Sequence, residues 1–385
     1  MTLSQPPLGS RDLDWVKQSL QSAVELEYAT LPIYLSAMFS LEVQNYTAYN
    51  TIRSVVMEEM VHMAIAANML AALGGSPRIK DIRIAFPVKG LPGGAEPDLQ
   101  VGPAQLSRRQ LQNFLRIEMP QALLRQTSRD EAYPTIAAFY ESIRRAIVDN
   151  ADAVRGAVRA GGPANQVGDD IGFTTIEYRP GLDPVQSLCA AIDEILEQGE
   201  GASAENLVTT SRYESEESHY AKFASLFYGA SYQEPVPRVK LGPETEPLFF
   251  KGGVIGWPKV VNTLAVPADG YAKILALDPD AAAVTKDLTA FDSALAAILG
   301  ALDAAWNGPA AVSWKTLGGA VHGMVDLRVL SCFNILRHEI PKGIVAQLPA
   351  LYPAEIDRLR DYGDLGKPAF YGPRFTNVTQ PAASA

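Results

Sequence analysis

Two histidines of this chain follow a glutamate by three residues. The pairs are Glu59 with His62 and Glu216 with His219, and the chain holds only four histidines. Because an α-helix turns by about 100° per residue, positions three apart lie on one helix face. A single pair of this kind is most often a surface contact. Two pairs, if both faced a core, would instead predict ligands for a buried metal.

The neighbours of both pairs are apolar at helical spacing. The residues that share the face of Glu59 are Ile52, Val55, Val56, Met63, Ala66, Leu70 and Leu73. Those that share the face of Glu216 are Tyr213, Tyr220, Phe223, Leu226 and Phe227. Both pairs are therefore expected to point into a helical core. Glu58, at the edge of its face, is expected to support the site rather than to bind metal.

A third acidic residue lies on an apolar helix face. Glu27 is in line with Val24, Leu31 and Tyr34 along the helix expected at 11–43. Its neighbour Glu25 falls among Gln18, Gln21, Ser22 and Ser36, and this polar face is expected to lie in water. Glu27 is therefore a third candidate ligand.

The fourth carboxylate is less well defined. Glu200 borders the apolar face of the helix expected at 183–201, about 80° from its centre. Glu197 lies farther from that face and is the alternative to Glu200. Glu118 is a more distant alternative.

Buried carboxylates need a partner. An isolated ionised carboxylate in an apolar core costs many kcal/mol unless it is paired or bound to a metal. No Lys or Arg falls on these helix faces near the acids. Four carboxylates and two imidazoles match the ligand set of two-metal helical bundles. Such ligands suit two divalent ions, with iron expected and manganese as the alternative.

The rest of the chain reads as helices joined by loops. Helices are expected at 11–43, 51–73, 107–119, 134–158, 183–201, 210–228, 280–306 and 314–339. Residues 76–104, with a strand at 82–86, and residues 160–183 are expected to form long crossover loops. The expected organisation is a metal-binding bundle at 11–229, a helical extension at 240–375 and a disordered tail at 376–385.

Composition narrows the setting. The net charge of −10 argues against nucleic-acid binding, which needs clustered Lys and Arg. The N-terminal residues lack the apolar core of a signal peptide, and no apolar run of membrane length is evident. Cys189 and Cys332 are far apart in sequence, which argues against a disulfide scaffold. A cytoplasmic protein without a membrane partner is expected.

Several segments resemble a known family. They are VELEYATLPIYLSAMFSL at 24–41, VVMEEMVHMAIAANMLAALGG at 55–75, EQGEG at 197–201 and SHYAKF at 218–223. They are similar to the ferritin-like domain associated with iminophenylpyruvate dimer synthases of the violacein and rebeccamycin pathways. The resemblance covers about residues 12–229. It implies an all-α ferritin-like four-helix bundle with metal ligands Glu27, Glu59, His62, Glu216 and His219, and it favours Glu200 as well.

Three functions follow from these expectations. The leading one is a di-iron oxidoreductase that acts on a small organic substrate with dioxygen or peroxide. The second is a ferroxidase that handles iron, and the third is a non-catalytic helical interaction module. The sequence assigns no catalytic residue and no organic cofactor. The extension at 240–375 could cap the bundle, shape a pocket or form a homodimer.

Overall fold

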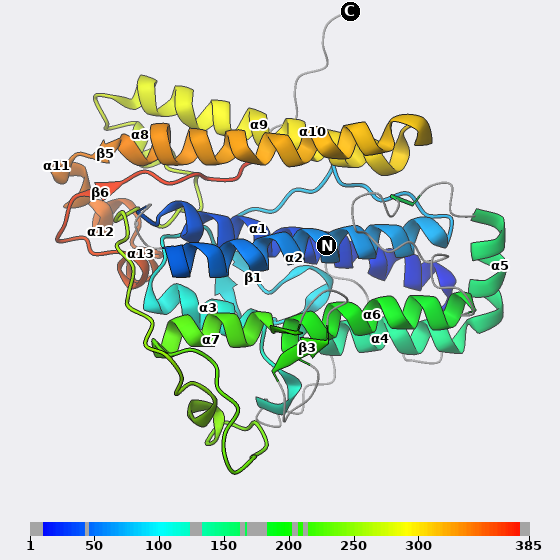
Figure 1. Ribbon diagram of the computed structural model, residues 1–385. Helices are drawn as coiled ribbons and strands as arrows, with labels where there is room; N and C mark the ends of the chain where they lie inside the picture. Colours follow the sequence, from blue (N-terminus) through cyan, green and yellow to red (C-terminus); the bar gives the residue numbers. More distant parts are fainter. Residues whose placement is uncertain are drawn as a thin grey trace, which may run out of the picture.

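The helices of the protein form three layers (Figure 1). The computed structural model describes residues 11–42, 46–123, 133–161, 166–167, 183–201, 207–210 and 215–377. The middle layer is a pair of long helices, α1 (Leu13–Phe39) and α2 (Tyr46–Ala72). One of its faces is covered by α9 (Ala281–Asn307) and α10 (Ala310–Val329). The other is covered by α3 (Arg108–Ile117), α4 (Ile136–Asp149), α6 (Pro184–Glu200) and α7 (His219–Tyr228).

The remaining elements are short. The other α-helices are α5 (Ala151–Gly161), α8 (Ala272–Leu275), α11 (Lys342–Val345), α12 (Leu348–Leu351) and α13 (Ile356–Tyr362). The single turns are η2 (Pro92–Gly94), η3 (Gln121–Leu123), η7 (Glu246–Phe249), η8 (Leu330–Asn334) and η9 (Ile335–Arg337). The strands form three antiparallel pairs: β1 (Val88–Lys89) with β2 (Gln100–Val101), β3 (Val208–Thr210) with β4 (Ser215–Glu217), and β5 (Glu339–Ile340) with β6 (Ala369–Phe370). The predicted all-α class is confirmed.

α1 is buried around most of its circumference. It begins after Asp12, whose side chain accepts a hydrogen bond of 2.9 Å from the backbone N–H of Trp15. The polar face predicted to lie in water is covered in part: Gln21, Ser22 and Ser36 are buried, Glu25 is half-buried and Gln18 is exposed. Gln21 accepts a hydrogen bond of 2.9 Å from the backbone N–H of Arg78. The expectation failed for the buried part of this face because a helix in the middle layer has neighbours on both sides.

Some expected element boundaries were wrong. The helix expected at 134–158 is two helices, α4 and α5, which meet at Asn150. No strand occupies 82–86; the nearby strand pair is β1 with β2. The last long helix ends at Val329, ten residues earlier than expected, and continues as a π-helical turn. These errors concern where elements end, which local periodicity determines poorly.

The predicted division into bundle, extension and tail stays a prediction. One hydrophobic core cluster contains residues of both α1 and α9, for example Leu20 and Leu299. Thr376 and Asn377, at the start of the predicted tail, are held by hydrogen bonds to Asp292 and Ile82. Residues 378–385 lie outside the described part of the chain.

Two helices are long and apolar enough to cross a membrane by length and composition, although no apolar run of membrane length was evident in the sequence. They are α2 and α9, and 78% and 50% of their most apolar windows are buried inside the protein. Core helices of soluble proteins meet the same criterion. This is weak support for a membrane partner.

A buried amide joins two of the layers. The side chain of Asn68, on α2, accepts hydrogen bonds from the indole N–H of Trp306 on α9 (2.8 Å) and from the backbone N–H of Val167 (2.9 Å). It also donates to the backbone oxygen of Val167 (3.0 Å). The indole N–H of Trp306 and both backbone groups of Val167 are therefore hydrogen-bonded to the single side chain of Asn68.

We predict that Asn68→Ala lowers the free energy of unfolding by about 1–3 kcal/mol, because it leaves buried donors and an acceptor without partners. Asn50→Ala is the matched control, since Asn50 is exposed near the start of α2. Denaturant unfolding of both variants checks the prediction. Equal stabilities would show that the amide does not join the layers.

Candidate metal centre

Two helices of the outer layer have an end in the middle of the bundle, beside α1 and α2 (Figure 1). α3 stops at Ile117, so that Glu118 is its C-cap, and Pro120 follows. A proline just after the C-cap cannot continue a helix. α7 starts at His219, and the Ser218 hydroxyl accepts a hydrogen bond from the backbone N–H of Ala221. These ends place Glu118 and His219 beside the middle layer.

Three residues form the core of the centre. Glu59, His62 and His219 each offer a ligand atom, and these atoms lie within 4.8 Å of one another. Glu59 Oε1 is 2.9 Å from His219 Nδ1 and 3.7 Å from His62 Nδ1. The two imidazole rings are stacked with centroids 5.2 Å apart. The other Glu59 oxygen accepts a hydrogen bond of 2.7 Å from the Thr30 hydroxyl.

Two further carboxylates flank this core. Glu27 and Glu118 are both buried, and Glu118 Oε2 is 3.5 Å from His219 Nδ1. Each accepts a hydrogen bond from a buried tyrosine: Tyr140 donates to Glu27 and Tyr34 to Glu118. The tyrosines hold one oxygen of each carboxylate and leave the other oxygen free to face the centre.

Each imidazole has a hydrogen-bond partner at Nε2, the ring nitrogen that lies away from Glu59. His219 Nε2 is 2.7 Å from Glu58 Oε2, and His62 Nε2 is 2.7 Å from the Gln198 side-chain oxygen. These oxygens accept, so each Nε2 donates and each Nδ1 faces Glu59. Lys222 donates to both oxygens of Glu58. Such hydrogen bonds are typical of imidazoles that bind metals.

Burial and the closeness of the three carboxylates shift the pKa values of the groups in the centre. Burial, together with the Glu59 charge, raises the pKa of Glu27 and of Glu118. Burial also acts to raise the pKa of Glu59, but hydrogen bonds and charge from His219 and His62 hold that pKa well below its ordinary value. Burial alone would lower the pKa of His219, yet Glu118, Glu58 and Glu59 raise it well above the usual range. Among the described residues, the positive charge beside the three buried acids comes from imidazoles, and hydroxyl groups add one hydrogen bond to each acid.

The residues present fit a metal on two observations. His219 Nδ1 is buried without a well-formed hydrogen bond, although Glu59 Oε1 is only 2.9 Å away. No Lys or Arg of the described residues pairs with Glu27, Glu59 or Glu118. A cavity of about 30 Å³ lies between these side chains, and a water-sized sphere needs roughly 10–15 Å³. A space of this size admits metal ions or water and excludes a larger ligand.

Four of the predicted ligands meet here, but Glu216 does not. Glu27, Glu59, His62 and His219 converge, whereas Glu216 lies on β4 with 49% of its side chain exposed. Its carboxylate pairs with Lys222 at 3.2 Å. The helix expected at 210–228 begins only at His219, so the helical spacing from Glu216 to His219 does not apply.

The structure does not test Glu200, the ligand expected on α6. The side chain of Glu200 lies outside the described part of the structure. Glu197 is not among the described residues that line the cavity, whereas Gly199 is. Gln198, which the sequence did not single out, contacts His62.

Glu118 takes the place expected for another acid. From the sequence, it was only a more distant alternative to Glu200. Its signal was the aromatic Phe114 one turn earlier on the same face, which packs against Tyr34. Glu58 contacts His219, which agrees with the supporting role expected for it.

Comparisons with known proteins agree with this geometry. A family model described as Ferritin-like matches residues 20–228. The chain belongs to the ferritin-like family. A solved ferritin-like protein from Caulobacter vibrioides is 21% identical, with a TM-score of 0.54, and the match covers 82% of this chain and 96% of that one. That likeness shows the fold alone. No curated protein matches the chain.

We predict that Glu59→Ala and His219→Ala each abolish stoichiometric metal binding, because both residues stand at the core of the ferritin-like centre. Glu216→Ala is the matched control and should keep the metal content of the parent, since that carboxylate faces solvent. Elemental analysis of the purified proteins checks this. Loss of metal in Glu216→Ala would instead mean that residues 210–228 form the expected helix once metal is bound.

Metal binding should also release protons. Without metal, the raised pKa of His219 keeps its imidazole protonated around neutral pH, and a metal must displace that proton. Apparent affinity is therefore expected to rise with pH, about tenfold per pH unit for each proton released. Calorimetric titration with Mn²⁺ in buffers of different ionisation enthalpy counts the protons. A pH-independent affinity would contradict this protonation state.

Proposed function

We propose that this ferritin-like protein holds two divalent metal ions, iron in preference to manganese, and is an oxidoreductase for a small organic substrate. The observation that carries the proposal is the convergence of three buried carboxylates and two imidazoles with no Lys or Arg beside the three acids among the described residues. Mixed oxygen and nitrogen ligands of this kind suit iron and manganese.

The roles of the side chains follow from their contacts. Glu59 lies between the two imidazoles and would hold metal together with His62 and His219. Glu27 and Glu118 would be the outer ligands. When bound, the two metals would supply the electrons and the binding site for dioxygen or peroxide. Glu58 and Lys222 keep the His219 ring in place and connect it to the half-exposed Glu216.

The tyrosines restrict how the carboxylates can move. Tyr34 packs against Phe114 and Phe223, with ring centroids 4.7 and 5.0 Å away. Tyr140 packs against Phe139. Because both rings are fully buried, their hydroxyls hold Glu118 and Glu27 in fixed positions and exclude bulk water from the centre.

A ferroxidase is the second candidate, and the size of the cavity favours it. Among the described residues the space beside the ligands is about 30 Å³, which admits ions, water or dioxygen but no organic molecule. The resemblance to the ferritin-like domain of iminophenylpyruvate dimer synthases favours the organic substrate instead. It does not specify which reaction that substrate would undergo.

We predict that the protein loaded anaerobically with Fe(II) oxidises about two irons per chain in a rapid phase when dioxygen is added. Stopped-flow absorbance and an Fe(II) assay measure this. Glu59→Ala should lack the rapid phase because it lacks the central carboxylate, while Glu216→Ala should keep it.

The two candidates differ after that phase. An oxidoreductase should stop at about two irons until a reducing substrate is supplied, whereas a ferroxidase should continue to consume added Fe(II). Protein that binds no metal under any of these conditions would contradict both candidates and leave the non-catalytic interaction module.

A further inference from the structure

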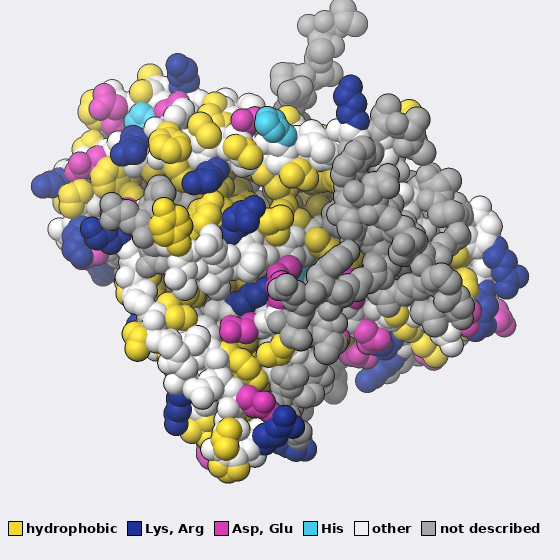
Figure 2. Space-filling model, in the orientation of Figure 1, with side chains coloured by type: hydrophobic (Ala, Val, Ile, Leu, Met, Phe, Trp, Pro, Cys, Tyr) yellow, Lys and Arg dark blue, Asp and Glu magenta, His cyan; other side chains and the backbone are white. Residues whose placement is uncertain are grey.

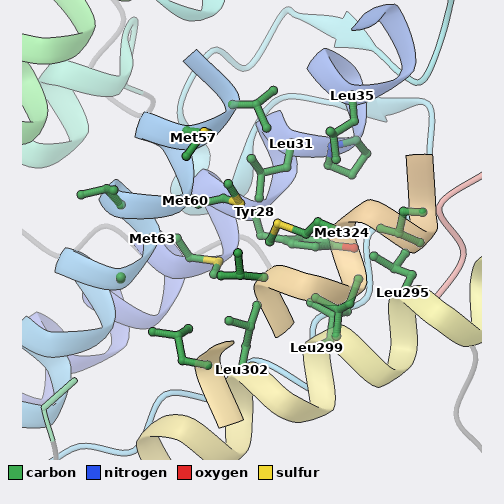
Figure 3. A pocket seen from close by; sticks show the side chains of 18 of the residues that line it. Tyr28, Leu31, Leu35, Met57, Met60, Met63, Leu295, Leu299, Leu302 and Met324 are labelled. Atoms are coloured by element: carbon green, nitrogen blue, oxygen red, sulfur yellow. The ribbon is translucent and has the colours of Figure 1, made fainter. Parts of the chain in front are cut away.

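A second cavity lies on the other side of the middle layer. Its volume is about 410 Å³, and it lies between α1 and α2 on one side and α9 and α10 on the other (Figure 3). Every lining side chain is apolar apart from the hydroxyl of Tyr28 and the indole N–H of Trp306. This size falls in the usual range of small-molecule sites.

This cavity is separate from the metal centre. Tyr28 and Met60 line it, whereas the preceding residues, Glu27 and Glu59, line the small cavity among the metal ligands. No described residue lines both cavities. Since successive helical residues point about 100° apart, the two sites face away from each other across α1 and α2. The larger cavity is therefore not the route to the metals.

The lining has the character of a binding site. Met57 and Val321, which line the cavity, are 46% and 55% exposed, so it is an apolar groove open to solvent. Contiguous exposed apolar surface of this kind often marks a binding site. Four of the eight methionines of the chain line it: Met57, Met60, Met63 and Met324. Methionine is flexible and polarisable, and it is common on surfaces that adapt to apolar ligands. Figure 3 shows these side chains reaching toward the same space from α2 and α10.

The polar groups limit the chemistry of the ligand. The indole N–H of Trp306 already donates to Asn68. The Tyr28 hydroxyl makes no hydrogen bond with the described residues, and Figure 3 shows its ring lying across the cavity. No charged side chain lines the space. A ligand here must be neutral where it is buried, and it can exchange one hydrogen bond with Tyr28.

We propose that this cavity binds a neutral, elongated apolar molecule, of two or three rings or a comparable length of chain, that carries one hydroxyl or carbonyl oxygen. The size follows because a cavity of roughly 150 Å³ holds one benzene. The ligand enters between α2 and α10, where Met57 and Gly318 are exposed. Figure 2 shows hydrophobic side chains gathered along this seam. The proposal does not depend on the proposed function of the metal centre.

Gly318 offers a way to fill the cavity. A Cβ added at Gly318 meets no atom within 4 Å, and the same holds for Gly319. Only Gly318 lines the cavity, while both glycines are exposed on α10. Gly318→Phe is therefore expected to occupy the mouth of the cavity without a backbone clash, and Gly319→Phe is the matched control in solvent.

The test uses the neutral fluorescent probe N-phenyl-1-naphthylamine. The parent should bind one probe per chain, and Trp306→Phe should reduce energy transfer to the probe more than the control Trp257→Phe, whose indole is exposed and does not line the cavity. Gly318→Phe should weaken binding at least tenfold and Gly319→Phe less than twofold. Metal content and thermal unfolding of each variant report whether the fold is kept. In Tyr28→Phe, affinity for 2-naphthol relative to naphthalene should fall at least threefold.

Other results would overturn the proposal. These are no saturable probe binding to the parent, or equal weakening by the two glycine variants. A third is that the probe leaves the protein unchanged while Gly318→Phe alone changes the oligomeric state. The seam between α2 and α10 would then be a contact between copies of the chain. If Gly318→Phe does not fold, a larger loss of energy transfer in Trp306→Phe than in Trp257→Phe still locates the probe beside Trp306, and equal losses in the two variants exclude this cavity.

Discussion

The structure depends on how three buried carboxylates are held around two imidazoles. Glu27 comes from α1, Glu59 from α2 and Glu118 from the end of α3, so the acids can meet only if three helices converge. Neighbouring carboxylate charges repel strongly in an apolar interior. The fold opposes that repulsion with His62 and His219, and it anchors one oxygen of each acid to a hydroxyl. A cation bound between the acids would complete the compensation that the imidazoles begin.

The helix ends are a consequence of this arrangement. An uninterrupted helix keeps its backbone groups paired and offers only side chains on one face. By ending α3 at Ile117 and starting α7 at His219, the chain brings two ligand-bearing termini to one level of the bundle. The N-terminus of α7 also carries a positive partial charge, which favours the surrounding carboxylates. The segments that interrupt the outer helices thus have a role at the centre, and they are not simple insertions into a regular bundle.

Sequence reasoning succeeded where helices are continuous and failed where they are interrupted. Glu27, Glu59 and His62 lie on unbroken helices, so the apolar spacing around them correctly indicated a buried face. The same reasoning extended a helix through 210–218, where β3 and β4 form a strand pair, and it wrongly assigned Glu216 to the core. Glu118 was only a distant alternative, and a residue at a helix end has neighbours that periodicity does not describe. Part of the polar face of α1 was misjudged because nothing local reveals that a second layer covers it.

The layer formed by α9 and α10 limits how this ferritin-like protein can assemble. On α1 and α2, neighbouring residues lie on different faces. Glu27 and Glu59 line the small cavity among the candidate metal ligands, and Tyr28 and Met60 line the cavity beside α9 and α10. Removing the layer of α9 and α10 would expose an apolar surface on the two helices that hold the metal ligands, and such surfaces drive association. The C-terminal helices are therefore integral to the stability of the centre, and they cover a face that a minimal four-helix subunit would leave open to partners. An assembly through that face is incompatible with this chain, which makes a cage built through the α9–α10 side of the bundle untenable for it.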